Sequence, residues 1–334
     1  MKLSLGILHN LRDSKVVYIG ETKGIHDLRF IKAIGERFQL DSFFLSENGD
    51  LENIDYSQYD LIVAAPLTRP ISVIPISIQI PIVGISLAYD LNSESPKSAL
   101  SANLQKCSFI ICDCQYICDK LKNEYGINQK RVGVIAYGCD LDLFVAKSLK
   151  TFNELNLLVT RNWFPTHSNR IIIDALQRLH NEGMDLKCTF VGDGPELQES
   201  KKELNKKSIK SNLSFLGSKS PIEISHQMET HEIYISASQS DGSSVSLMEA
   251  LASGMICVVS NFPSNLEWIK DRYSGFLFQN GSEESLANTL KEVLALDPQA
   301  LATIGERARK IAVEKANWGN NKIEFLEFLE SVIE

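Results

Sequence analysis

The sequence predicts an α/β protein made of two Rossmann-like, doubly wound domains that face a cleft. Three observations support this class. The 334 residues exceed what one ordinary core supports. Apolar runs of strand length alternate with amphipathic helical stretches. This alternation occurs in both halves of the chain, and it is typical of parallel sheets covered by helices on both faces.

The second half carries the clearer pattern. We expect strands at 155–160, 186–192, 213–217, 233–238, 255–260 and 275–278. The intervening helices are expected to begin near Asn169, Pro195, Ile222, Ser244, Ser264 and Ser282. Alternation of this kind predicts one complete doubly wound domain.

The first half repeats the pattern less regularly. Its strands are expected at 15–20, 43–46, 61–65, 82–87, 109–112 and 132–136. The polar stretch 147–154 is the best boundary, since linkers are polar and carry few contacts. We therefore assign 1–150 to an N-terminal domain and 151–315 to a C-terminal domain. A last amphipathic helix is expected at 320–334.

Composition narrows the function classes. A net charge of −8 lacks the broad positive field of a nucleic-acid binder, so we expect no nucleic-acid partner. Seven cysteines without regular spacing indicate reduced thiols, which fits a cytoplasmic protein. The N-terminus does not have the pattern of a signal peptide. The apolar stretch 71–88 is interrupted by Pro75 and Pro81 before it could span a bilayer as a helix.

The most informative segment is 235–260, which predicts a strand, a glycine turn, a short helix, a stop at Gly254 and another strand. The turn Asp241-Gly242-Ser243-Ser244 places backbone N–H groups and two hydroxyls at a helix N-terminus, which favours a phosphate or sugar oxygens. Ser246, Glu249 and Ser253 share one helix face. Glu249 is suited to accept two bonds from a ribose diol; the alternative is a capped core helix with a solvated Glu.

This segment resembles glycosyltransferase family 4, the retaining enzymes of GT-B fold. That family commonly carries Glu, seven residues, Glu, with Gly-Phe-Gly after the first Glu. Here Asp241 stands seven residues before Glu249, and Gly242-Ser243-Ser244 replaces Gly-Phe-Gly, as in a branch with the motif DGSSVSLMEA. The resemblance implies that Glu249 holds the donor ribose, that Asp241 contacts the transferred sugar, and that the N–H groups of Gly242 to Val245 contact sugar and diphosphate.

The resemblance covers nearly all of the C-terminal domain, through LLVTRNWFPTHSN, VGDGPELQES and LSFLG. It places Arg161 against the diphosphate, a role that suits a guanidinium because it forms bidentate, charge-assisted bonds; the alternative is a surface ion pair. His167 stands where the family usually has Lys, so either it is protonated when the donor binds or Arg170 supplies the charge.

Glycines complete the expected donor side. Gly192-Asp193-Gly194 closes a strand and opens a helix, which predicts either a nucleotide-facing loop or a plain turn. The third glycine of a dinucleotide fingerprint is missing, which weakens an NAD interpretation. Gly217 ends the matching LSFLG segment, so we place it on the donor side as well.

The resemblance is thinner in the first domain, where it rests on VIAYGCDLDLF at 134–144. Asp90 is retained from a His, Gly, any residue, Asp motif whose His is absent, and His26 lies where members place a glycine-rich acceptor loop; we assign both to the acceptor side. A capping or packing role is the alternative for His26. The family also implies that the last helix, 316–334, packs back on the N-terminal domain.

We expect no metal and no cofactor, with a nucleoside diphosphate sugar as co-substrate. Asp140-Leu141-Asp142 has the spelling of a metal-binding triplet but precedes a linker, and the cysteines at 107, 112, 114 and 118 lack paired C-x-x-C units.

The predicted function is therefore that of a retaining glycosyltransferase. It would use a UDP- or GDP-sugar and a glycan, lipid-linked or other hydroxyl acceptor, in surface polysaccharide or glycoconjugate synthesis. We expect the protein in the cytoplasm, with peripheral contact at the inner face of the membrane left open. Two rivals are a non-catalytic glycosyltransferase-like binding subunit and another sugar-nucleotide enzyme such as an epimerase.

Overall fold

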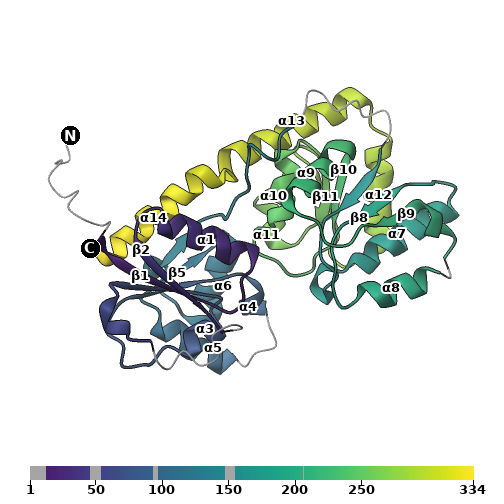
Figure 1. Cartoon of the computed structure of the whole chain (residues 1–334). Coiled ribbons are helices and arrows are strands. Elements are labelled where there is room, and N and C mark those ends of the chain that lie inside the picture. The colour runs from purple at the N-terminus through teal and green to yellow at the C-terminus, as the bar shows by residue number, and fades with distance from the viewer. Residues whose placement is uncertain (1–12, 46–53, 93–96, 147–154, 206) are drawn as a thin grey trace. The chain divides into compact units, whose positions relative to one another are not determined.

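The computed structural model describes residues 13–45, 54–92, 97–146, 155–205 and 207–334, which form two compact units (Figure 1). One unit comprises Met1–Tyr137 with Gly319–Glu334, and the other comprises Gly138–Trp318. The polar stretch 147–154, expected as the domain boundary, lies outside the described residues. No helix among the described residues is both long and apolar enough to cross a membrane.

The first unit is built on a parallel sheet that contains six described strands in the order β2-β1-β3-β4-β5-β6. The strands are β1 Lys15–Gly20, β2 Gln39–Phe44, β3 Leu61–Ala65, β4 Ile82–Ile85, β5 Phe109–Cys112 and β6 Val132–Val134. The helices are α1 Ile25–Gly35, α3 Arg69–Ser72, α4 Tyr89–Asn92, α5 Lys97–Lys106, α6 Gln115–Tyr125 and α14 Trp318–Ile333. The apolar face of α14 belongs to this core, because Phe325 packs 5.2 Å from Phe30 and Phe328 lies 5.8 Å from Phe109, between ring centroids.

The second unit has a parallel sheet whose described strands run in the order β12-β11-β10-β7-β8-β9. The strands are β7 Leu157–Val159, β8 Cys188–Phe190, β9 Leu213–Phe215, β10 Ile233–Ser236, β11 Ile256–Ser260 and β12 Phe276–Phe278. The helices are α7 Asn169–Asn181, α8 Leu197–Leu204, α9 Pro221–Thr230, α10 Val245–Ala252, α11 Pro263–Leu266, α12 Glu283–Leu294 and α13 Pro298–Lys315.

Side-chain alternation along β10 shows that helices cover both faces of this sheet. Ile233 and Ile235 enter the core that α7 and α12 cover, whereas Tyr234 between them points to the opposite face and bonds to α10. The predicted fold class, two doubly wound α/β units, is confirmed.

Two elements differ from the expectation. The second strand is Gln39–Phe44 rather than 43–46, and it pairs with β1 from Lys15↔Gln39 onward. As an edge strand it is half polar and mostly exposed or half-buried, so it lacks the continuous apolar run that marks a buried strand. Ser46 lies outside the described residues. The helix α13 was not expected, because its buried face is made largely of small residues such as Gly305, Ala308 and Ala312 and gives a weak apolar period.

Candidate functional site

The topology of the second sheet creates a switch point between β7 and β10. From β7 the chain moves to β8 and β9 on one side, and it then returns to β10 on the other side of β7. The loops that leave the carboxyl ends of β7 and β10 therefore diverge. In open α/β sheets ligands bind in the crevice at such a point, and the predicted donor residues Arg161 and Asp241 lie on these two loops.

The Arg161 side chain joins the two loops. Its Nη2 lies 2.5 Å from an oxygen of Asp241, and its Nη1 donates to the hydroxyl of Ser244 at 2.7 Å and of Ser246 at 3.3 Å. Only 11% of the Arg161 side chain and 21% of the Asp241 side chain are exposed. The structure thus brings Arg161 to a partly buried position beside Asp241, Ser244 and Ser246, which lie 80 to 85 residues later in the sequence.

The glycine turn is held by its own side chains. Asp241 accepts a second bond from the N–H of Gly242 at 3.0 Å. Ser244 caps α10 by accepting from the N–H of Leu247, and Val245 begins the helix. Burial raises the pKa of the Asp241 carboxyl, and the neighbouring Arg161 guanidinium acts in the opposite direction.

Two buried aromatic residues form hydrogen bonds with serines of this site. The Tyr234 hydroxyl lies 2.8 Å from the Ser246 hydroxyl, which also bonds to Arg161 and to Ser244. The indole N–H of Trp268 donates to Ser243 at 3.0 Å. Neither role was expected from the sequence: Tyr234 lies in an apolar strand whose pattern indicates only burial, and Trp268 stands in the segment Ser264-Asn265-Leu266-Glu267-Trp268, whose resemblance to the family assigns the indole no partner.

Glu249 lies within α10, and its side chain is 8% exposed. It follows Ser246 by three residues, so both lie on the helix face that Arg161 and Tyr234 approach. The helix is buried along its whole length, which excludes the alternative of a solvated glutamate on an exposed face.

The predicted glycines lie in the loops after β8 and β9. Gly192 and Gly194 have φ values of +129° and +152°. A Cβ on Gly194 would lie 2.7 Å from the Trp163 carbonyl oxygen, and one on Gly192 would lie 2.9 Å from that of Arg161. These two glycines therefore allow the loop after β8 to pack against the loop that carries Arg161. Gly217, with φ +69°, accepts from the N–H of Gly192 through its carbonyl.

His167 lies near Arg161 but carries no charge near neutral pH. Burial and, secondarily, the Arg161 charge lower the pKa of His167 to about 4. Its Nδ1 lies 2.8 Å from the carbonyl oxygen of Asn162, and since a carbonyl only accepts, Nδ1 carries the proton. The neutral ring then offers a lone pair at Nε2, so His167 does not replace a lysine charge in this state.

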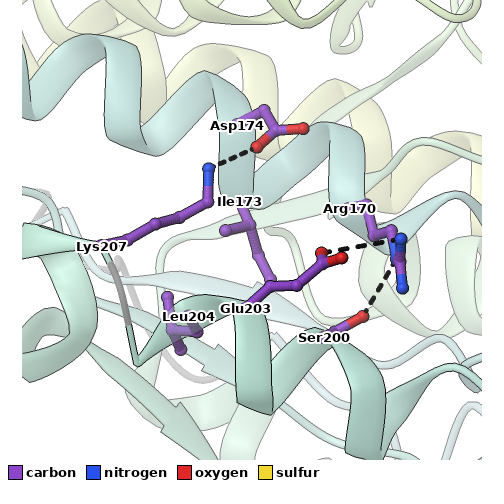
Figure 2. Close-up of a pocket in the computed structure, with 7 residues that line it drawn as sticks. All are labelled: Arg170, Ile173, Asp174, Ser200, Glu203, Leu204 and Lys207. Atoms are coloured by element: carbon purple, nitrogen blue, oxygen red, sulfur yellow. Dashed lines mark hydrogen bonds and ion pairs between the residues drawn. The ribbon is translucent and has the colours of Figure 1, made fainter.

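Arg170 does not supply the missing charge either. It points to α8, where it bonds to Ser200 and pairs with Glu199 at 3.0 Å and Glu203 at 3.6 Å. Arg170 lines a small cavity between α7 and α8 (Figure 2). The volume of this cavity is about 100 Å³. Lys207 forms a second ion pair there, with its Nζ 2.7 Å from Oδ1 of Asp174. Each cation that lines this cavity is thus already paired with a carboxylate.

The two predicted acceptor-side residues lie in the first unit. The His26 ring, in the first turn of α1, lies 5.7 Å from the Tyr137 ring. Tyr137 donates to the Ser86 carbonyl, and the Ser86 hydroxyl donates to Asp90 at 2.9 Å. Asp90 is 1% exposed, and it also accepts from the backbone N–H groups of Leu67, Leu87 and Leu91. These four hydrogen bonds hold the loops after β3 and β4 together.

The described residues contain no group of three or more His, Cys, Asp or Glu arranged to hold a metal ion. Asp140 accepts from the N–H groups of Asp142 and Leu143, so it caps its own turn. The seven cysteines are free thiols buried in the fold.

Residues 148–311 match the model of the family described as Glycosyl transferases group 1. The alpha-monoglucosyldiacylglycerol synthase of Streptococcus pneumoniae is 26% identical over 238 residues, which cover 67% of this chain and 52% of that protein. An Escherichia coli UDP-Gal:alpha-D-GlcNAc-diphosphoundecaprenol alpha-1,3-galactosyltransferase is 24% identical over 208 residues, or 58% of this chain and 52% of that protein. The chain thus spans about half the length of these curated relatives.

Solved structures show the same fold over nearly the whole chain. HepE from Anabaena in complex with UDP-glucose superposes with a TM-score of 0.78 at 20% identity, covering 95% of this chain and 99% of that one. The sucrose-phosphate synthase of Thermosynechococcus elongatus superposes with a TM-score of 0.81 at 13% identity, covering 96% and 99%. The chain is therefore similar in sequence to the group 1 glycosyl transferases over residues 148–311, and it is similar in fold to these solved structures along almost its entire length.

Proposed function

We propose that this protein is a retaining glycosyltransferase of family 4 type. It moves a sugar from a nucleoside diphosphate donor, UDP- or GDP-linked, to a hydroxyl acceptor. The observation that carries the proposal is the partly buried Arg161 beside the N-terminus of α10 at the β7–β10 switch point. A guanidinium and aligned backbone N–H groups form an anion site suited to a diphosphate.

The same groups suit the chemistry of transfer. Breaking the anomeric C–O bond leaves negative charge on the departing diphosphate, and fixed positive groups there lower the barrier. Arg161 and the N–H groups of Gly242 to Val245 take this role, Glu249 holds the donor ribose, and Asp241 contacts the transferred sugar. Gly192, Gly194 and Gly217 shape the nucleotide loop. His26 and Asp90 lie on the acceptor side, Asp90 through the loops it holds.

This assignment needs neither a metal nor a cofactor, because protein groups provide the charge for the leaving diphosphate. Two curated relatives are named for a glucosyldiacylglycerol and for a diphosphoundecaprenol-linked acceptor. We therefore propose a glycan or lipid-linked acceptor here, in surface polysaccharide or glycoconjugate synthesis, with the enzyme at the cytoplasmic side of the membrane. The N-terminal unit binds the acceptor and the C-terminal unit binds the donor.

The test begins with thermal shifts against UDP, GDP and a panel of their sugars, with Arg161→Met and Glu249→Ala alongside. Stabilisation by one nucleotide series, weakened in both variants, supports the donor site. The sugar nucleotide that stabilises best then enters transfer assays with and without EDTA, and NMR of the product reports the anomeric configuration.

One observation favours a second function. Among the described residues assigned to the donor diphosphate, Arg161 is already paired with Asp241, and His167 is neutral near neutral pH. That arrangement also fits a non-catalytic binding subunit. A folded protein that responds to no nucleotide would favour the subunit over the enzyme, and formation of an epimerised sugar nucleotide without transfer would favour an epimerase.

A further inference from the structure

In this structure the Asp241 carboxylate occupies donors that the proposed function assigns to the substrate. One carboxylate oxygen lies 2.5 Å from Nη2 of Arg161, and the other accepts from the N–H of Gly242 at 3.0 Å. A guanidinium and a backbone N–H just before a helix are the groups that bind phosphate oxygens. The protein's own anion thus lies where an incoming anion would bind.

Arg161 has little hydrogen-bonding capacity beyond this pair. Its Nη1 is directed at the hydroxyls of Ser244 and Ser246, which fix the guanidinium against α10. Its Nε is buried and so shielded from a ligand, and it has no hydrogen-bond partner among the residues that the structure describes. Of the guanidinium nitrogens, Nη2 is therefore the one available to bind a ligand, and in this structure it donates to Asp241.

We infer that Asp241 is an internal anion that competes with the nucleoside diphosphate for Arg161 and for the Gly242 N–H, and so weakens retention of the free nucleotide. This inference rests on the proposed function. A bound diphosphate either displaces the carboxylate or lies beside it with like-charge repulsion, and both outcomes reduce affinity. Once the sugar has left, Asp241 recovers its two donors and favours release of the nucleotide product.

The chain offers a matched comparison at the next loop. Asp193 precedes Gly194 as Asp241 precedes Gly242, and its carboxylate accepts from the Gly194 N–H at 2.8 Å. Among the described residues Asp193 forms no ion pair with an arginine, and it lies at the same edge of the same sheet. Removing the charge of Asp193 therefore shows how much UDP affinity changes when any one carboxylate near the site is neutralised, because Arg161 stays paired with Asp241.

The test is isothermal titration of UDP into the wild-type chain, Asp241→Asn and Asp193→Asn. Asn retains an oxygen that can accept from the Gly242 N–H, so the turn is kept while the charge is removed. We expect Asp241→Asn to bind UDP about tenfold more tightly and to release it more slowly in stopped-flow tryptophan fluorescence. Asp193→Asn should change the affinity by about twofold or less. If Asp241→Asn does not fold, Asp241→Ser serves in its place.

The outcomes separate the two proposals. Wild-type binding with equal or weaker binding by Asp241→Asn would overturn the competition and leave the proposed function standing. Equal tightening in both variants would also overturn it, because the effect would then be general electrostatics. The proposed function itself fails if the wild type and the variants are folded and none of them binds UDP or GDP.

Discussion

The ion pair between Arg161 and Asp241 should appear as a measurable coupling in the stability of the second unit. The perturbations are Arg161→Met, Asp241→Asn and the double variant. Two unit charges about 4 Å apart attract by about 4 kcal/mol at an effective dielectric constant near 20. Desolvation of both groups offsets part of this attraction, and the side chains are 11% and 21% exposed. We therefore expect a coupling of about 1–2 kcal/mol.

The single variants should differ in cost. Arg161→Met leaves a partly buried carboxylate without its cation and should lower the unfolding free energy by about 3 kcal/mol. Asp241→Asn keeps a neutral hydrogen bond and should cost about 1–2 kcal/mol. The double variant should lose less than the sum, since no unpaired charge remains.

The assay is urea unfolding followed by tryptophan fluorescence, which is selective for this unit. The three tryptophans are Trp163, Trp268 and Trp318, and all lie within Gly138–Trp318. The pH dependence gives a second check. Burial raises the folded-state pKa of Asp241, so in Arg161→Met the penalty is full above that pKa and shrinks as the pH falls through it. Costs that simply add in the double variant would refute the reasoning.

Three further outcomes are expected. The pKa of His167 is lowered to about 4, so His167→Ala should change the affinity for UDP at pH 7.5 by about threefold or less. His167→Lys should increase this affinity. A large loss of affinity in the alanine variant would show that the ring is charged in the complex. Tyr234→Phe should lower the rate of sugar transfer about two- to tenfold with little loss of stability, because only the bond that positions Ser246 is removed, and steady-state kinetics beside urea unfolding measures both. Asp90→Asn should destabilise the first unit by about 2–4 kcal/mol, because the new amide nitrogen would face backbone N–H donors. Faster hydrogen exchange in β3 and β4 would report this loss of stability. Unchanged protection of these strands would contradict the role of Asp90 in holding the loops.

The elements that could be predicted from sequence are those whose pattern is local. Buried strands such as β3 and β10 are continuous apolar runs, and α10 begins at a capping Ser244, so each is recognisable without a partner. The edge strand β2 was misplaced because its bounds follow from pairing with β1, which lies more than 20 residues earlier. The helix α13 was missed because alanine packs well but leaves a weak periodic signal.

The candidate site divides in the same way. The glycine turn and Glu249 can be proposed from residue types and spacing, because a helix N-terminus places N–H groups and side chains predictably. Arg161 is assigned to the diphosphate by the resemblance to family 4. Tyr234, Trp268 and the support for Asp90 were not, since a hydroxyl or indole N–H finds its partner only after distant segments pack.

The two doubly wound units, a glycine turn at 241–244 whose composition favours phosphate, and an arginine after the first strand of the second unit can all be read from the sequence. That Arg161 is already paired with Asp241, that His167 is neutral and that Arg170 points to α8 become known only once the chain is folded. The difference arises from how far apart in the sequence the interacting groups lie. Strand and helix patterns depend on neighbours a few residues apart, whereas charge states and ion pairs depend on the burial and distance of groups some 80 residues apart, such as Arg161 and Asp241.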